Sequence, residues 1–240
     1  MTTQALLEVT ALGKRFGGFV ALESIDLSVG ENQRVGLIGP NGSGKSTLVN
    51  CMSGTLAHEM GSVHFAGQVL DGMSAHERTR LGLARSFQLP RPFNTLSLAD
   101  NLRVPLLYTG RRGVQPINEQ CMELLRTVGL AEKAGHRPRD LTQIEMRKLE
   151  LARAMAANPR LLIADEAMAG LSHSEVDDVL ALLIRLNEQG VTIILIEHIM
   201  RAVMHFSQRL VVLVAGRKIA DGNPADVVRD PGVVRAYLGE

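Results

Sequence analysis

Hydrophobic residues recur along this chain in two periods, which alternate from one end of the sequence to the other. Short apolar runs that are β-branched or alternate with polar residues predict strands at 6–9, 19–29, 34–38, 161–164 and 191–196. Apolar residues three or four positions apart predict helices, and the clearest stripe consists of Val176, Val179, Leu180, Leu183 and Leu186. Strands that alternate with helices favour an α/β fold with a mostly parallel sheet.

The helical pattern is densest in the middle of the chain. It predicts a helical subdomain at roughly 90–158, inserted into a core made of 1–89 and 159–240. In the first part of the core a glycine-rich loop leads into a helix at 46–53, and 61–70 resembles a hairpin. We therefore expect one domain, in which an N-terminal antiparallel β part joins the parallel sheet.

The composition narrows the class of protein. With 240 residues, 45% of them hydrophobic, the chain is long enough for one large domain with a buried core. Lysine and arginine number 26 against 25 aspartate and glutamate, and this net charge of +1 argues against binding nucleic acid through bulk charge. Aromatic residues make up 3% and tryptophan is absent, which disfavours a surface for stacking bases. We therefore expect no nucleic-acid partner.

Cysteines and apolar segments indicate the compartment. Cys51 and Cys121 match no metal-binding spacing and are expected to be buried thiols in a reducing environment. No signal-peptide pattern is visible at the N-terminus, and the longest apolar runs fall far short of the ~20 residues that span a bilayer. The sequence therefore predicts a cytoplasmic protein that contacts a membrane only through a partner.

A phosphate-binding loop follows the strand predicted at 34–38. Residues 39–47 fit G-x-x-x-x-G-K-[ST] at every required position, between a strand and a helix. Glycines let backbone N–H groups converge on an anion, and the new helix directs its positive dipole end to the same place. Lys45 can supply a cation to the β- and γ-phosphates, and Ser46 an oxygen to Mg²⁺. The residues expected to hold the nucleotide are Gly39, Pro40, Asn41, Gly42, Ser43, Gly44, Lys45, Ser46 and Thr47.

Two adjacent acids, Asp165 and Glu166, follow the apolar strand predicted at 161–164. The ends of parallel strands face the ligand crevice of such a sheet, so both carboxylates are expected beside the phosphates. Asp165 can help to hold Mg²⁺, and Glu166 can orient or deprotonate the attacking water, a role worth about 10²–10⁴-fold in rate. The alternative is an acidic helix start whose carboxylates serve the helix dipole. The phosphate-binding loop favours the catalytic interpretation.

The phosphate-binding loop alone is shared by kinases, GTPases and motor ATPases, but the order of further features resembles the ATP-binding subunits of ABC transporters over 6–240. By that resemblance Gln88 is the family's Gln-loop residue, which reaches Mg²⁺ and couples to the membrane subunit. His198 is then the switch histidine that contacts the γ-phosphate. Phe16 resembles the aromatic residue that stacks on adenine, and 169–172 resembles the D-loop at the dimer seam. The resemblance implies an ATPase that binds ATP with Mg²⁺ and powers transport.

The signature loop, by which each subunit of the family contacts the ATP of its partner, departs here from the usual L-S-G-G-Q. Both glycines and the final glutamine are replaced, while the hydroxyl and the helix pattern after the loop are retained. A branched side chain and a negative charge are unfavourable near phosphate, since unit charges roughly 4 Å apart interact by about 4 kcal/mol at an effective dielectric of about 20. The threonine and glutamate also form a capping box. The altered loop consists of Leu141, Thr142, Gln143, Ile144 and Glu145.

An intact nucleotide site beside an impaired signature loop favours asymmetric ATP sites. We therefore expect a heterodimer with a second ABC ATPase subunit, rather than a homodimer, attached to integral membrane permease subunits at the inner face of the cell membrane. Stretches such as 15–22, 82–88 and 236–240 resemble the subgroup that imports branched-chain amino acids and similar small solutes. A lipopolysaccharide-type exporter ATPase and a soluble ABC-fold nucleotide switch remain alternatives.

Overall fold

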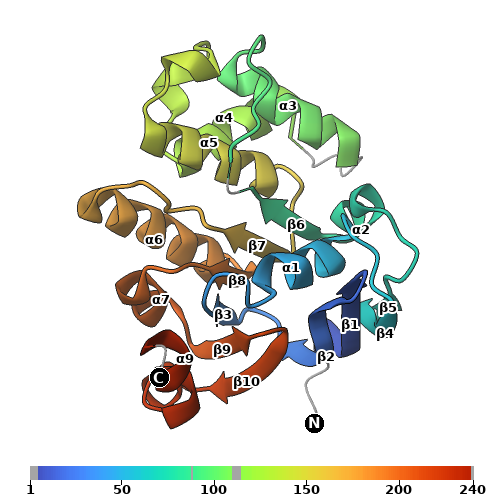
Figure 1. Cartoon of the computed structure of the whole chain (residues 1–240). Coiled ribbons are helices and arrows are strands. Elements are labelled where there is room, and N and C mark those ends of the chain that lie inside the picture. Colours follow the sequence, from blue (N-terminus) through green and yellow to red (C-terminus); the bar gives the residue numbers. More distant parts are fainter. Residues whose placement is uncertain (1–4, 88, 110–114, 239–240) are drawn as a thin grey trace.

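Two sheets organise the fold, which a computed structural model describes for residues 5–87, 89–109 and 115–238 (Figure 1). The strands in these residues are β1 (Leu7–Phe16), β2 (Phe19–Val29), β3 (Arg34–Ile38), β4 (Met60–Phe65), β5 (Gln68–Val69), β6 (Leu83–Ser86), β7 (Leu161–Asp165), β8 (Thr192–Ile196), β9 (Arg209–Val214) and β10 (Arg217–Gly222). Within the described chain the larger sheet has six strands in the order β10-β9-β3-β8-β7-β6, and the smaller has four in the order β2-β1-β4-β5.

The inner strands of the larger sheet are buried on both faces. Its strands from β9 to β6 pair in parallel, and β10 adds an antiparallel edge. Alternate residues of β7 enter different cores, with Leu161 and Ile163 on one face and Leu162 and Ala164 on the other. Strands covered on both faces need apolar residues at nearly every position, so β7 and β8 are almost entirely apolar, whereas the edge strand β10 is not. The parallel strands present their carboxyl ends to one edge of the sheet.

Helices cover both faces of this sheet. Helix α1 and the smaller sheet pack on one face, while α6 and α7 pack on the other. The helices in the described residues are α1 (Lys45–Ser53), α2 (Ala75–Leu81), α3 (Leu98–Thr109), α4 (Ile117–Thr127), α5 (Gln143–Met155), α6 (His173–Glu188), α7 (Met200–Phe206), α8 (Pro224–Val227) and α9 (Pro231–Leu238).

Helices α3, α4 and α5 lie between β6 and β7 in the chain and form the upper part of the molecule in Figure 1. They pack on one another through buried side chains that include Leu98, Leu102, Cys121, Leu125 and Leu149. The helical stretch predicted for the middle of the sequence corresponds to these three helices. That 90–158 forms an inserted subdomain of a single domain stays a prediction.

The structure confirms the predicted α/β architecture and corrects several elements. The strands predicted at 19–29 and 34–38 have those bounds, and β4 and β5 form the predicted hairpin. The strand predicted at 6–9 is too short, because β1 continues to Phe16 through irregular register that breaks its alternation. β6, α2, β9, β10 and the C-terminal helices were not predicted. β6 has four residues, which is too few to show a period.

Both cysteines are free and buried, as predicted. Burial raises the pKa of Cys51 to about 11, so its thiol is protonated and unreactive at neutral pH. No helix in the described residues is both long enough and apolar enough to cross a membrane.

Candidate functional site

The loop between β3 and α1 is shaped by glycines that neighbouring strands enclose tightly. Gly39 has a φ of 156°, and a Cβ there would lie 2.1 Å from the carbonyl oxygen of Leu213. Gly44 has a φ of 101°, and its Cβ would lie 2.7 Å from the carbonyl oxygen of Ala21. Gly44 also provides no side chain to cap α1. The first N–H groups of that helix are therefore left to an anion, as the sequence predicts.

Lys45 lies within the loop that it is predicted to serve. Its Nζ donates hydrogen bonds to the carbonyl oxygens of Gly39 and Pro40 at 2.6 and 3.1 Å. Burial lowers the pKa of Lys45, and the charges of Asp165 and Glu166 act in the opposite direction. The structure thus brings both predicted acids within electrostatic reach of the predicted phosphate ligand.

A cavity of about 250 Å³ opens over this loop. It is lined by 41–47, Glu166 and two aromatic side chains, Phe16 and Phe19. Phe16 is 50% exposed and Phe19 is 64% exposed. Exposed rings in the wall of a polar cavity suit stacking against a planar base. Sequence analysis selected Phe16 but missed Phe19, because Phe19 is equally well explained as the first residue of a strand.

Asp165 is the last residue of β7, and an arginine of the neighbouring strand holds it. Arg85 of β6 donates one hydrogen bond to Asp165 Oδ2 and another to Asn50 Oδ1, both at 2.6 Å. Its guanidinium also lies 5.3 Å from the centre of the Phe87 ring. The buried carboxylate therefore has a compensating charge. Sequence analysis missed Arg85, because residues 80 positions apart give no local signal of pairing.

Glu166 lies in a tight turn directly after β7. Its φ of 46° is a left-handed conformation that is uncommon for a residue with a side chain. The turn is held by a hydrogen bond of 2.9 Å from the N–H of Glu166 to the carbonyl oxygen of Ile196 at the end of β8. Its side chain lines the cavity over the phosphate-binding loop. This is where a general base for an attacking water is needed.

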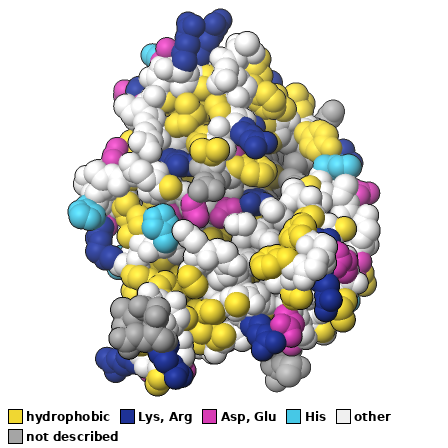
Figure 2. All heavy atoms as spheres, viewed as in Figure 1, with side chains coloured by type: hydrophobic (Ala, Val, Ile, Leu, Met, Phe, Trp, Pro, Cys, Tyr) yellow, Lys and Arg dark blue, Asp and Glu magenta, His cyan; other side chains and the backbone are white. Residues whose placement is uncertain are grey.

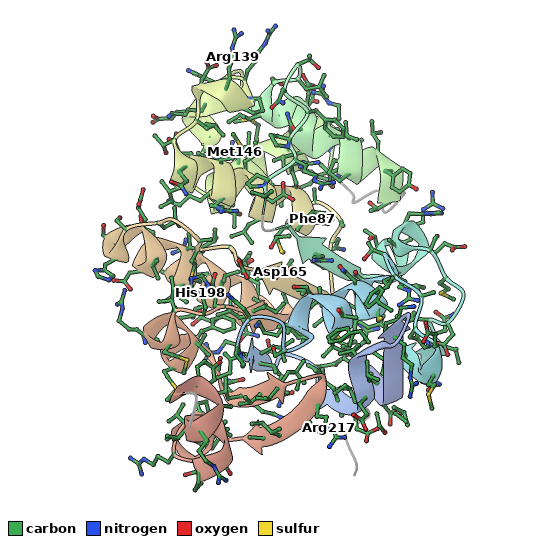
Figure 3. The ribbon with its side chains drawn as sticks, viewed as in Figure 1. Phe87, Arg139, Met146, Asp165, His198 and Arg217 are labelled. Carbon is green, nitrogen blue, oxygen red and sulfur yellow. The ribbon has the colours of Figure 1, made fainter. Side chains whose placement is uncertain are left out.

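His198 comes two residues after the end of β8, which pairs with β7 through Asp165 and Ile196. Its side chain is 67% exposed and lies outside the walls of the cavity. In the view of Figure 3, Asp165 lies between His198 and Phe87. Figure 2 shows acidic and histidine side chains gathered in the middle of this face. Gln88, the remaining predicted ligand, lies outside the described residues.

The residues expected to hold Mg²⁺ offer few oxygen atoms. Ser46 contributes a hydroxyl at the start of α1, and Asp165 contributes a carboxylate. In the described part of the chain, no three histidine, cysteine or acidic side chains gather in a way that could hold a metal ion. This donor set fits Mg²⁺ that is shared with phosphate oxygens and water, which is how Mg²⁺ accompanies nucleotides. The residues therefore fit a metal ion that arrives with ATP.

The altered signature loop satisfies its polar groups within its own chain. The predicted capping box is present: the N–H of Glu145 donates to Thr142 Oγ1 at 3.4 Å, and the N–H of Thr142 donates to Glu145 Oε2 at 3.0 Å. Lys133 adds an ion pair of 2.6 Å, and its hydrogen bond lowers the pKa of Glu145. Ile144 packs against the core of the helical part. These contacts reduce the repulsion that the sequence alone predicts between this loop and a phosphate.

The same loop contacts the segment that resembles the D-loop. Gln143 Nε2 and Arg147 Nη2 both donate to the carbonyl oxygen of Ala169, at 3.3 and 3.1 Å. A Cβ on Gly170 would lie 2.5 Å from Gln143 Nε2. The start of α5 and the segment after Glu166 are therefore packed together. Sequence analysis identified both segments but not their contact.

A parallel sheet with a phosphate-binding loop after β3 and two acids at the end of β7 defines a phosphate-loop nucleotide hydrolase. The profile of the family described as ABC transporter matches residues 22–169, so the chain belongs to this family, whose ATP-binding cassettes are ATPases that power transport. A second profile, described as branched-chain amino acid ATP-binding cassette transporter, matches residues 217–240. The predicted fold, family and enzyme class are confirmed.

Relatives match almost the whole chain. One is the high-affinity branched-chain amino acid transport ATP-binding protein BraF of Pseudomonas aeruginosa, 38% identical over 99% of both chains. Another is LivG of Escherichia coli, which has the same description, 35% identical over 99% of both chains. An ATP-binding cassette of an ABC transporter, solved in its ADP conformation, superposes with a TM-score of 0.89 at 30% identity, covering 99% of this chain and 100% of that one.

Proposed function

We propose that this chain is the ATP-binding and hydrolysing subunit of an importer for branched-chain amino acids or similar small organic solutes. One observation carries the catalytic part: the loop at 41–47 and Glu166 line the same cavity, so a phosphate ligand and a candidate base converge on one space. The full-length likeness to BraF and LivG supports the solute class. The match at 217–240 supports it independently.

The residues of this cavity divide the work of binding and hydrolysis. Phe16 and Phe19 stack on the base, and 39–47 binds the phosphates through backbone N–H groups and Lys45. Ser46, Asp165 and, by resemblance, Gln88 would hold Mg²⁺, which when bound would neutralise phosphate charge.

Hydrolysis then uses a positioned water molecule as the nucleophile. Glu166 accepts a proton from this water as its oxygen bonds to the γ-phosphorus, and the bond to the bridging oxygen breaks so that ADP leaves with the electron pair. By the family resemblance, His198, which lies outside the walls of this cavity, contacts the γ-phosphate once ATP is bound.

An exposed apolar surface beside β6 is the proposed contact with the permease. Phe87 and Tyr108 are exposed, and both line a second cavity of about 150 Å³ whose wall also includes Arg85, Glu150 and Arg153. Apolar side chains gathered on one face commonly mark an interaction site. Gln88, which the family resemblance assigns to coupling, adjoins Phe87. The chain would thus be held at the inner face of the cell membrane by permease subunits.

The second ATPase subunit of the complex is proposed to differ from this chain. The support is the signature loop, in which Gln143 and Ile144 replace glycines whose bare backbone permits close approach to phosphate. Glu145 is neutralised by Lys133, so charge repulsion contributes less to the asymmetry than the lost glycines do. A partner with an intact signature loop would complete the ATP site of this chain.

The binding part of the proposal is tested by calorimetric titration of ATP with and without Mg²⁺. We expect Mg²⁺-dependent binding by the wild type, and a loss of at least about tenfold in affinity for Lys45→Ala, since a charged hydrogen bond contributes roughly 1.5–3 kcal/mol. Lys218→Ala, which removes a lysine paired with Asp221 on β10, is the matched control. Equal binding by wild type and Lys45→Ala would overturn the assignment.

The solute class is tested in vesicles that contain the complete complex with its permease subunits and solute-binding protein. We expect ATP-dependent uptake of leucine, isoleucine or valine that requires this chain. Uptake that is confined to chemically unrelated solutes contradicts the proposed solute class and leaves the ATPase assignment standing.

A further inference from the structure

A buried acid that these roles leave unused lies beside the candidate site. Glu197 directly follows β8 and precedes His198, and only 1% of its surface is exposed. Its Oε1 accepts a hydrogen bond from the backbone N–H of Met168 at 2.8 Å. Among the described residues its Oε2 has no hydrogen-bond partner, and Nδ1 of His198 lies 3.9 Å from it. One oxygen is therefore bound to the backbone, and the other lies near the proposed γ-phosphate contact.

The hydrogen bond to Met168 joins the two loops that carry the proposed catalytic side chains. Met168 belongs to the segment that begins with Glu166, and Glu197 belongs to the segment that carries His198. A second bond between these segments runs from the N–H of Glu166 to the carbonyl oxygen of Ile196, at 2.9 Å. Two hydrogen bonds thus hold the left-handed turn at Glu166, which has a φ of 46°. One is to Ile196 at the end of β8, and the other is to Glu197 directly after it. Such a conformation persists only where surrounding bonds hold it.

Glu197 is costly for stability where it lies. Burial raises the pKa of Glu197, and the charge of Glu166 acts in the same direction, while His198 and the bond from Met168 act against it. Buried charges in proteins are normally compensated by a charged partner. Asp221 of β10, for comparison, accepts hydrogen bonds of 2.6 and 2.8 Å from a single arginine. An apolar residue at position 197 avoids the cost, so stability alone does not favour an acid there.

We propose that Glu197 is a positioning residue for ATP hydrolysis: Oε1 fixes the turn that carries Glu166, and Oε2 orients the ring of His198. This inference rests on the proposed function, because it assigns Glu197 to the reaction at the same site. A carboxylate suits both tasks, since its two acceptor oxygens can meet a backbone N–H and a ring nitrogen at once. Groups that orient catalytic side chains in this way commonly contribute about 10–100-fold to activity.

Two substitutions distinguish positioning from packing. Glu197→Gln keeps an oxygen for the N–H of Met168 but removes the charge near His198, whereas Glu197→Leu removes both. We expect kcat for ATP hydrolysis to fall about 10–100-fold in Glu197→Leu and by a smaller factor in Glu197→Gln, with the Kd for Mg²⁺-ATP within about twofold of the wild type. Asp221→Asn, an acid-to-amide change three strands away in the sheet, should leave kcat unchanged.

Kinetics, calorimetry and thermal melting are measured on the same full-length preparations, in complex with the partner subunit where turnover requires it. Should Glu197→Leu fail to fold, Glu197→Gln alone decides the question by its kcat. Equal kcat values in the wild type and in each folded Glu197 variant overturn the positioning role and leave the proposed function standing. A loss of ATP affinity that accounts for the lost activity overturns it as well. Wild-type protein that neither binds nor hydrolyses ATP overturns the proposed function, and this inference with it.

Discussion

Two helices of this protein begin at loops that the family uses to contact phosphate, and their starts are built in opposite ways. Helix α1 begins after Gly44, which has no side chain, so the chain leaves its first N–H groups to an external anion. Helix α5 begins after Thr142, whose hydroxyl and capping partner Glu145 occupy that position. Lys133 then neutralises the glutamate. A helix N-terminus binds an external phosphate readily only where its own chain leaves it uncapped.

This contrast assigns different roles to the two loops. The start of α1 is left without a side-chain cap, which suits its proposed role of holding this chain's own ATP. The start of α5 is organised for the stability of its own helix, and its bonds to Ala169 serve the same chain. The following predictions test this difference, beginning with the largest effect.

The intact side is the candidate nucleotide site formed by the loop before α1 and by Glu166. The largest effect is expected there, from Glu166→Gln. Loss of a general base should lower ATP turnover by about 10²–10⁴-fold, while the loop and Lys45 still bind Mg²⁺-ATP. Turnover by phosphate release and binding by calorimetry measure the two effects. Glu188→Gln, at the end of α6 on the surface, is the matched control and should keep full activity. Turnover that persists in Glu166→Gln would place the base elsewhere.

The altered side is the signature loop at 141–145 before α5. A smaller change in ATP turnover, an increase, is expected from substitutions there. Replacing Ile144 by Gly and Glu145 by Gln removes the capping carboxylate and restores a bare backbone. In the complex with the partner ATPase subunit, turnover should rise by about tenfold, the equivalent of one recovered charge-assisted hydrogen bond of roughly 1.5 kcal/mol. Steady-state ATPase assays of the complex measure it. No increase, in protein that melts normally, would show that the altered loop does not limit hydrolysis.

The next effect concerns stability near the intact site. Because burial raises the pKa of Glu197, its ionisation begins to destabilise the folded state above about pH 4.5, the ordinary value, and the full cost is present above the raised pKa. Glu197→Gln should therefore raise the melting temperature at pH 8 by at least about 2 °C, and the gain should shrink as the pH approaches 4.5. Asp221→Asn loses an ion pair and should melt lower instead. A pH-independent difference for Glu197→Gln would contradict this explanation.

The smallest effect is expected from Lys133→Met on the altered side. The ion pair is partly buried, and even an exposed pair contributes about 0.2–1 kcal/mol, while the hydrogen bond from Lys133 lowers the pKa of Glu145. The pair stabilises the protein fully above the unfolded-state pKa of Glu145, about 4.5. This stabilisation is lost as the pH falls through the lowered pKa of the folded state. The variant should be slightly less stable to urea at pH 7, with a smaller difference at pH 4. A difference that grows on acidification would speak against the pair.

Local patterns located the phosphate-binding loop and the acid that shares its cavity, because consecutive residues carry both, while the roles assigned to them stay predictions. The loop at 39–47 fits a sequence motif, and the residues before it have the pattern of a strand. The two acids follow a plainly apolar strand. Of the contacts at the altered signature loop, the capping box was predicted, but the ion pair with Lys133 and the bonds to Ala169 were not. Lys133 and Glu145 belong to different elements, and no spacing rule pairs them. Arg85 was missed for the same reason, since its partner lies on another strand.

The left-handed turn at Glu166 has a consequence for how such proteins change over generations. Asparagine, aspartate and glycine adopt this backbone conformation more easily than most residues do, and β-branched residues resist it. With Glu166 as the proposed general base, its replacement by asparagine or glycine would remove the base without unfolding the turn. On that proposal a cassette that binds ATP without hydrolysing it is one tolerated substitution away, and a pair with one working and one resting member could diverge gradually from identical copies.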